Sequence, residues 1–131
     1  MAKHNIIGKI GENIACEWLK SKGFIILEQN YLKKFGEIDI VARETKKMHL
    51  IEVKTVSYET REDLDYSVSH ETWRPEENVH KEKQRRLKNA IAVWLSEHRY
   101  KGEWQIDILT VKLVPREKYA QIKIIGNVIF E

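Results

Sequence analysis

The sequence has little of what builds disulfides, flexible linkers or membrane spans. Its 131 residues include one cysteine, Cys16, with two prolines and six glycines. A single cysteine cannot form an internal disulfide, which favours the reducing cytoplasm, and so few glycines and prolines exclude collagen-like and low-complexity chains. No apolar run approaches the ~18–20 residues of a membrane helix, and the N-terminus lacks the apolar core of a signal peptide. We therefore expect a cytoplasmic protein that does not bind a membrane.

The residues that are present fit one globular domain. Hydrophobic types make up 42% of the chain and charged types 33%, which is enough for one core with a solvated surface. At ~100–200 residues per domain, the length predicts a single domain over residues 1–131. The net charge of +3 is too small to indicate a nucleic-acid partner by itself.

The charge is unevenly distributed along the chain. Residues 57–78 contain seven acids and two bases, whereas residues 79–88 contain five bases and one acid. An acidic segment therefore directly precedes a basic one. The small net charge hides a local positive patch, which is the kind of surface that a polyanion binds.

Hydrophobic periodicity predicts two helices and five strands. Apolar residues at spacings of three and four indicate helices, and short runs rich in Ile, Val and Phe indicate strands. The predicted helices cover 6–22 and 79–98, and the predicted strands cover 24–31, 37–43, 48–56, 104–114 and 121–130, the last at a sheet edge. The order α-β-β-β-α-β-β predicts an α/β fold, a mixed β-sheet flanked by helices.

The acidic segment 57–78 shows no clean periodicity. Structureless loops longer than ~12–15 residues are uncommon in compact domains. The segment is therefore functional, mobile, or the carrier of a short element that periodicity does not reveal.

The strongest chemical signal is Asp39, followed by Glu52 and Lys54 on the next strand. If the two strands pair through a turn at 45–47, Asp39 and Glu52 lie roughly opposite each other, because they are nearly symmetric about position 46. Side chains alternate along a strand, so Glu52 and Lys54 emerge on the same face. Their neighbours are apolar, and charged groups in a covered strand are costly unless they are paired or bind a metal.

Two interpretations of these residues stay open. Two carboxylates on adjacent strands form a hard oxygen site suited to Mg²⁺, where Lys54 can orient or deprotonate a water or stabilise phosphate charge. The alternative is a cross-strand salt bridge of Asp39 or Glu52 with Lys54.

Glu12 is a candidate third carboxylate. In the helix predicted over 6–22 it lines up with Ala15, Cys16 and Leu19, so it borders the apolar stripe. It can complete or support a metal site from the helix side, or its carboxylate can simply reach from this boundary to solvent.

Lys83 and Gln84 begin the second predicted helix and extend its apolar stripe. Their side chains are expected to overhang the end of the sheet, where they can contact substrate phosphates. Arg86 on the same helix and Lys34 in the turn before the second strand complete our candidates for nucleic-acid binding. For Arg86, the alternative is a solvated outer face.

Asp39 with Glu52-x-Lys54 resembles the PD-(D/E)xK nuclease signature, with Ile38 in place of the leading proline. A wider pattern, over about residues 5–111, resembles the YraN family, small bacterial proteins regarded as candidate endonucleases and distantly similar to archaeal Holliday junction resolvases. The segments that carry the wider resemblance are Gly8-x-x-Gly11-Glu12-x-x-Ala15, Gly23-Phe24-x-Ile26-Leu27-x-x-Asn30, Gly36-Glu37-Ile38-Asp39-Ile40-Val41-Ala42, Glu52-Val53-Lys54-Thr55 and Val79-x-x-x-Lys83-Gln84-x-x-Leu87-x-x-Ala90 with Trp94-Leu95.

The resemblance implies a restriction-endonuclease-like fold in which Glu12 joins Asp39, Glu52 and Lys54 in a catalytic site. The expected function is a Mg²⁺- or Mn²⁺-dependent endonuclease acting on DNA, with branched or repair intermediates as candidate substrates. Asp39, Glu52 and the Val53 carbonyl are the expected metal ligands, with Glu12 in support. Similarity to resolvases also suggests a homodimer, because two symmetric strand cuts suit two-fold symmetry.

Two alternative functions involve no catalysis. One is a nucleic-acid-binding module on the same fold that lacks turnover. The other is an interaction protein whose acidic 57–78 loop binds a basic partner, with the carboxylates only structural. Catalysis requires Mg²⁺ or Mn²⁺ and binding alone does not, so metal dependence separates these hypotheses.

Overall fold

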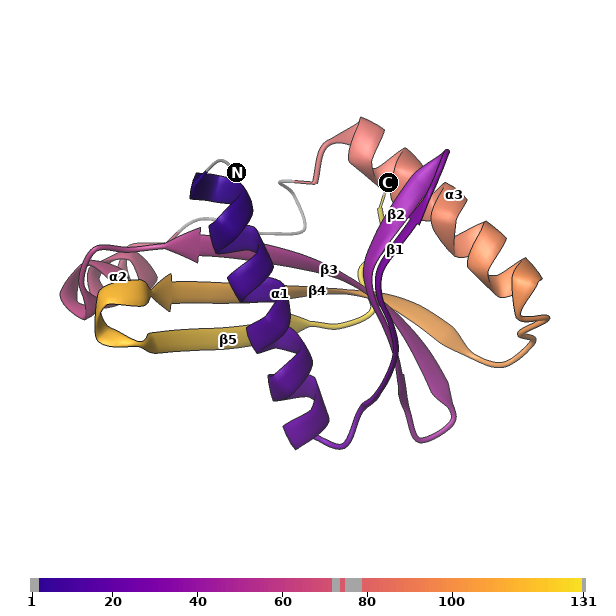
Figure 1. Ribbon diagram of the computed structural model, residues 1–131, viewed down its shortest axis with the longest axis horizontal. Helices are drawn as coiled ribbons and strands as arrows, with labels where there is room; N and C mark the ends of the chain where they lie inside the picture. The colour runs from indigo at the N-terminus through magenta and orange to yellow at the C-terminus, as the bar shows by residue number, and fades with distance from the viewer. Residues whose placement is uncertain (1–2, 72–73, 75–78, 131) are drawn as a thin grey trace.

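The structure is a computed structural model that describes residues 3–71, 74 and 79–130. Its elements in chain order (Figure 1) are α1 (Lys3–Ser21), β1 (Ile25–Lys33), β2 (Gly36–Glu44), β3 (Lys47–Ser57), α2 (Arg61–Ser69), α3 (Lys81–Glu97), β4 (Trp104–Val114), the 3-10 turn η2 (Pro115–Glu117) and β5 (Tyr119–Ile125). Within the described ranges, no helix is long and apolar enough to cross a bilayer.

The strands form one mixed sheet in the order β1-β2-β3-β4-β5. β3 and β4 run parallel, and the other neighbours pair antiparallel. Short turns join the antiparallel pairs, whereas α2 and α3 lie in the long connection that a parallel pair requires. β5 is an edge strand, so the predicted edge position of the last strand is confirmed.

α1 and α3 cover opposite faces of this sheet. The core cluster under α1 comprises Ala15, Cys16, Leu19, Ile40, Ala42, Ile51, Val53, Leu109 and Val111. The core cluster under α3 comprises Tyr31, Ile38, Val41, Met48, Leu50, Leu87, Ala90, Ile91 and Trp94. Neighbouring residues of β3 thus pack on different helices, as side-chain alternation in a strand requires. The predicted α/β architecture, a mixed sheet flanked by helices, is confirmed and is consistent with a restriction-endonuclease-like fold.

The predicted loop 57–78 contains the helix α2, which periodicity did not reveal. Thr60 caps this helix by accepting a hydrogen bond from the Asp63 N–H at 3.0 Å. Leu64 is the buried residue of α2, which is too little apolar signal for a prediction. The order of elements is therefore α-β-β-β-α-α-β-β, one helix more than predicted. Residues 72–73 and 75–78 of the same segment lie outside the described residues.

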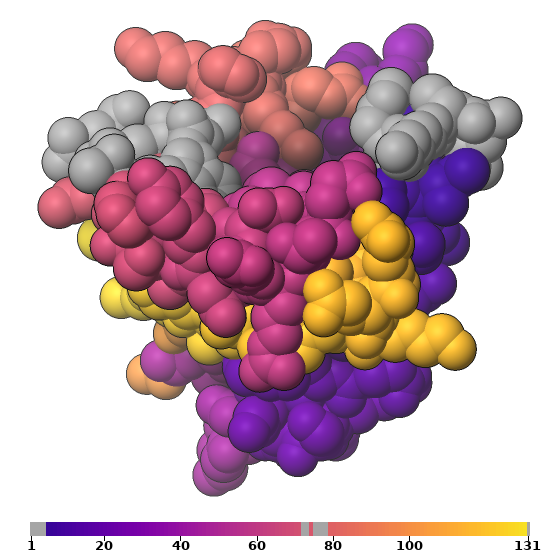
Figure 2. All heavy atoms as spheres, turned by 90° about the vertical axis from the view of Figure 1, so that its left-hand side faces the viewer, coloured from indigo at the N-terminus to yellow at the C-terminus, as the bar shows by residue number. Residues whose placement is uncertain are grey.

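α2 docks beside the turn that joins β4 and β5, as Figure 2 shows from the left-hand side of Figure 1. Glu117 accepts a hydrogen bond from the Arg61 N–H at 2.8 Å, and the Arg61 guanidinium lies 4.0 Å from the centre of the Tyr119 ring. The Lys112 ammonium donates to Glu71 at 2.8 Å. These contacts hold the described part of the acidic segment on the end of the sheet.

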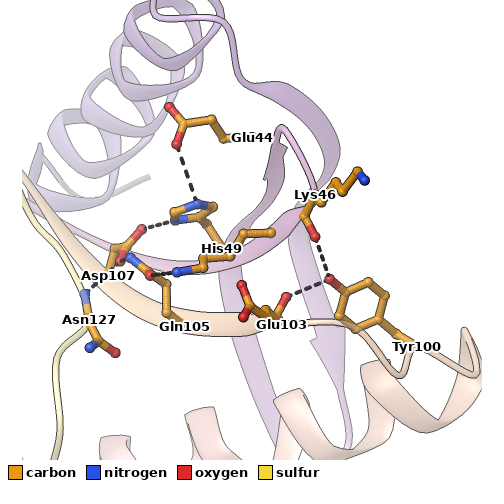
Figure 3. A network of polar contacts seen from close by, with 9 residues as sticks. Glu44, Lys46, His49, Tyr100, Glu103, Gln105, Asp107 and Asn127 are labelled. Carbon is orange, nitrogen blue, oxygen red and sulfur yellow. Dashed lines mark hydrogen bonds and ion pairs between the residues drawn. The ribbon is translucent and has the colours of Figure 1, made fainter.

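β5 covers Tyr119–Ile125 rather than the predicted 121–130, because its ladder with β4 ends at Ile125 and Asn127 has a positive φ of 54°. The Asn127 N–H donates to Asp107 at 3.0 Å, and the Val128 N–H donates to the Ile106 carbonyl at 2.7 Å. Asp107 is fully buried and lies 2.5 Å from Nδ1 of the buried His49 (Figure 3). Because a carboxylate only accepts, His49 donates from Nδ1. This network ties the C-terminal segment to β3 and β4.

α3 lies directly on the start of β2. A Cβ atom on Gly36 would lie 1.8 Å from the Arg86 carbonyl oxygen, so only glycine allows the two backbones this approach. Asn89 also donates to the Phe35 carbonyl at 3.5 Å. The close approach fixes the position of α3 relative to the β1–β2 hairpin.

Gly36→Ala is expected to destabilise the protein by about 1–3 kcal/mol, the usual cost of overpacking, as measured by urea unfolding. Gly8→Ala is the matched control, because nothing lies within 4 Å of a Cβ at that helical position. Alanine there is expected to be neutral or to stabilise α1 by roughly 0.5–1 kcal/mol. A Gly36 variant as stable as the Gly8 variant would contradict the packing of α3 on β2.

Candidate active site

β2 and β3 separate at Asp39. The paired residues of the two strands end at Ile40 and Ile51, and this register places Asp39 beside the next residues of β3, as the predicted hairpin does. There Asp39 Oδ2 accepts a hydrogen bond from the Val53 N–H at 2.8 Å. A side-chain oxygen thus replaces a backbone partner, and the β1–β2 hairpin rises at a steep angle to β3 (Figure 1).

A cavity of about 1110 Å³ opens where the strands separate. Glu12 of α1 and Lys83 of α3 both line it, although the two helices cover opposite faces of the sheet. Its lining residues are Asn5, Ile7, Gly8, Lys9, Glu12, Asn30, Asp39, Val53, Thr55, Val56, Ser57 and Lys83. The gap in the ladder therefore lets groups from both faces meet.

Glu12 faces Asp39 in this cavity. Partial burial, followed by the charge of Asp39, raises the pKa of Glu12 to about 7, and Lys9 offsets only part of this effect. A carboxyl that simply reached into solvent would not meet these groups. The structure therefore brings Glu12 to the Asp39 carboxylate, as the metal-site hypothesis requires.

Glu52 is the most deeply buried member of the cluster, with 1% of its side chain exposed. Burial, followed by the charge of Asp39, raises the pKa of Glu52 to about 8. Its Oε1 atom lies 2.5 Å from Lys83 Nζ, yet this oxygen has no hydrogen-bond partner of good geometry among the described residues. Burial opposes the charge of Lys83, but Glu52 outweighs it and raises the pKa of the ammonium, which stays protonated.

Lys54 lies on the face of β3 that carries Glu52 and is partly buried. Burial, followed by repulsion from Lys83, lowers the pKa of the Lys54 ammonium. The ion pair of Glu52 is made with Lys83 from α3, whereas the salt-bridge alternative placed Lys54 in that position. The amino groups of Lys54 and Lys83 therefore both lie near the carboxylates. Of the two, Lys54 loses its proton more readily because its pKa is lowered.

The oxygen atoms of the carboxyl groups at this site are chemically suited to a hard divalent cation. The Glu12 and Glu52 carboxyl groups both lie close to Asp39, and Mg²⁺ prefers carboxylate oxygens and usually takes few protein ligands beside waters and phosphate. Across residues 3–71, 74 and 79–130, no three His, Cys, Asp or Glu side chains stand together as a ready ligand set. Glu52 is engaged by Lys83, so its carboxylate is not presented to the cavity in this arrangement.

Of the four candidates for nucleic-acid binding, Lys83 lines the cavity. Gln84 donates from Nε2 to the Val79 carbonyl at 2.7 Å and so holds the chain that enters α3. Arg86 is half-buried where its carbonyl meets the hairpin. Lys34 is exposed at the β1–β2 turn, with its ammonium 5.6 Å from the centre of the Phe35 ring.

Asn30 and Lys9 line the cavity but were not among the candidate site residues. Asn30 lines the cavity from β1 with a positive φ of 56°, at the point where β1 faces Asp39. Lys9 lies one helical turn before Glu12 and lowers the pKa of that carboxyl. The spacing of Lys9 from Glu12 on one helix face was the available signal, whereas nothing in the sequence reveals the backbone conformation of Asn30.

Comparisons with known proteins show one family. The sequence profile described as "Uncharacterised protein family UPF0102" matches residues 11–111. A UPF0102 protein of Dictyoglomus turgidum is 40% identical over 122 residues, which cover 92% of this chain and 94% of that protein. A UPF0102 protein of Campylobacter lari is 37% identical over 108 residues, 81% of this chain and 83% of that protein.

A third relative, the UPF0102 protein Ccon26_01140 of Campylobacter concisus, is 35% identical over 113 residues, 84% of this chain and 87% of that protein. The matched region contains Glu12, Asp39, Glu52, Lys54 and Lys83. The resemblance to the YraN family is confirmed, and the chain belongs to the uncharacterised family UPF0102.

Proposed function

We propose that this protein is a divalent-cation-dependent nuclease that hydrolyses phosphodiester bonds in DNA. The observation that carries the proposal is that Glu12 and Asp39 line one open cavity with Lys83, while the buried Glu52 lies directly behind Lys83 and Lys54 lies near both. Carboxyl groups with raised pKa values next to two amino groups are typical of a site that binds a cation and a phosphate.

The residues divide into ligands and proton-handling groups. Asp39, Glu52 and the Val53 carbonyl hold the cation in this proposal, and Glu12 supports them. Mg²⁺ or Mn²⁺, when bound, supplies positive charge next to the scissile phosphate. Lys54, whose pKa is lowered by burial and by Lys83, accepts the proton of the attacking water or stabilises the charge that develops on the phosphate.

The energetic cost of the cluster supports a functional role. Burial and the charge of Asp39 both oppose ionisation of Glu12 and Glu52, so the ionised cluster lowers the stability of the fold. Groups that destabilise a fold persist where they perform chemistry. A cross-strand salt bridge would not require that Asp39 lie close to two further carboxyl groups, those of Glu12 and Glu52.

DNA is the proposed substrate because α3 carries the basic patch and because the motif resembles that of nucleases. Branched or repair intermediates, and a homodimer to cut them symmetrically, belong to the same proposal. The alternatives give other outcomes: a binding module binds DNA without cleaving it, and an interaction protein does neither. None of residues 58–71, the described part of the acidic segment beyond β3, lines the cavity.

Asp39→Asn is expected to reduce Mg²⁺- or Mn²⁺-dependent cleavage of labelled DNA by roughly 10²–10³-fold, the effect of losing one electrostatic contact in an active site. DNA affinity should stay the same or rise, because a negative charge is removed beside the phosphate. Asp65→Asn on α2 makes the same chemical change at an exposed position and should leave both unchanged.

Two results would contradict this reading. A normal cleavage rate in the Asp39 variant would exclude its role as a metal ligand. A wild-type protein that binds DNA but does not cleave it with either cation would favour the binding module.

Glu52→Gln is expected to stabilise the fold increasingly as the pH rises. Burial and Asp39 raise the folded-state pKa of Glu52 to about 8, above the ~4.3 of an unfolded chain. Between these pH values the folded protein binds a proton that the unfolded protein has released, so the contribution of Glu52 to stability falls as the pH rises. The variant should gain little at pH 5 and roughly 3–5 °C in Tm at pH 8, measured by calorimetry. A gain in Tm that does not grow with pH would contradict the raised pKa of the Glu52 carboxyl in the folded protein.

A further inference from the structure

Lys83 stands between the deepest carboxylate and the cavity. Lys83 Nζ lies 2.5 Å from Glu52 Oε1, and 40% of the Lys83 side chain is exposed against 1% of Glu52. Of the residues that the structure describes, Lys83 lines the cavity and Glu52 does not. A cation that enters from the cavity therefore meets the ammonium before it meets the Glu52 carboxylate.

The contact is electrostatic and replaceable. Glu52 Oε1 lies 2.5 Å from Lys83 Nζ, and no other side chain among the described residues shares this oxygen. A lysine ammonium is a point charge on a flexible four-carbon stem, and the exposed side of Lys83 leaves it room to move. Glu52, in contrast, is fixed in the middle of β3 between Ile51 and Val53.

The backbone of Lys83 is held in place by the fold, whereas its side chain is flexible and partly exposed. Gly36 lets the hairpin lie against the α3 backbone at Arg86, and Gln84 ties the start of α3 to the Val79 carbonyl. Lys83 directly precedes Gln84 and lies three residues before Arg86. Its backbone position is therefore set by the fold, and only the side chain needs to rearrange.

We propose that Lys83 is a tethered counter-cation, which occupies the place of the divalent cation at Glu52 in the metal-free protein and is exchanged for it on metal binding. This inference rests on the proposed function. In its ionised form, Glu52 is compensated in each state, first by the ammonium and then by the metal. The exchange also moves Lys83 out of contact with Glu52, which leaves its ammonium at the cavity for a phosphate oxygen. Metal binding thereby prepares the site for the nucleic acid.

The surrounding charges agree with an exchange. Lys54 lies close enough for Lys83 to oppose its charge, so removing Lys83 from Glu52 relieves a repulsion between two ammonium groups. Asp39 and Glu37 also act on Lys83, and Asp39 stays as a cavity-lining ligand throughout. The place that Lys83 leaves is therefore bordered by acids and suits a cation.

The test is calorimetric titration of the full chain with Mn²⁺ in the absence of nucleic acid. Lys83→Met removes the competing ammonium and is expected to bind Mn²⁺ roughly tenfold more tightly than the wild type, within the usual range of coupling between two sites. Lys83→Arg is expected to bind Mn²⁺ more weakly, because a guanidinium can hold a carboxylate with two parallel hydrogen bonds. Lys88→Gln removes a positive charge from an exposed position of the same helix and should change the affinity less than twofold.

A crystal structure with Mn²⁺ provides the second measurement, which separates exchange from simple charge repulsion. The expected result is that Lys83 Nζ has left Glu52 and that Mn²⁺ contacts the Glu52 carboxylate. Mn²⁺ bound with Lys83 still on Glu52, or a Lys83→Met variant that binds no more tightly, overturns the inference but leaves the proposed function intact. If neither the wild type nor any variant binds Mn²⁺, both the inference and the proposed metal-dependent function fail.

Discussion

The gap between β2 and β3 is the feature on which the rest of the site depends. If β2 and β3 stayed paired beyond Ile40 and Ile51, the sheet would separate the side chains of α1 from those of α3. The Asp39 carboxylate instead accepts the Val53 N–H, which satisfies a buried donor that would otherwise be costly. One side chain thus ends the strand pairing without an energetic penalty at that backbone group. It also opens the cavity that Glu12 and Lys83 both line.

The same gap explains the unusual charge balance. Glu12, Asp39 and Glu52 come from two elements, α1 and the sheet, and each is partly or wholly shielded from water. Shielding strengthens both the repulsion among these acids and their attraction to a lysine. Lys83 supplies the positive charge that pairs with Glu52. It is carried by α3, whose position depends on Gly36. The packing of α3 on the start of β2 therefore decides whether the charge of the carboxylates is balanced.

The sequence predicted what local periodicity and symmetry control. The β2–β3 turn fixed the register that brings Asp39 to Glu52 and Val53, and helical spacing placed Glu12 on the face that meets them. α2 was missed because it buries Leu64 alone among polar neighbours, and β5 was misplaced because Asp107, on another strand, captures the Asn127 N–H. Hydrogen bonds between distant segments leave no periodic signal.

The partner of Glu52 shows the same limit at the site itself. The sequence offered Lys54, two residues away on the same strand face, but Lys83 holds the carboxylate although it lies 31 positions along the chain. Residues at i and i+2 of a strand point the same way and stand side by side, whereas a lysine on a covering helix can approach a buried carboxylate from above. The Asp39 and Glu52 carboxylates are therefore placed by the sheet, and their counter-charge is placed by α3. Since α2 and the acidic segment separate the two in sequence, a working arrangement exists only after the helix has docked on the hairpin.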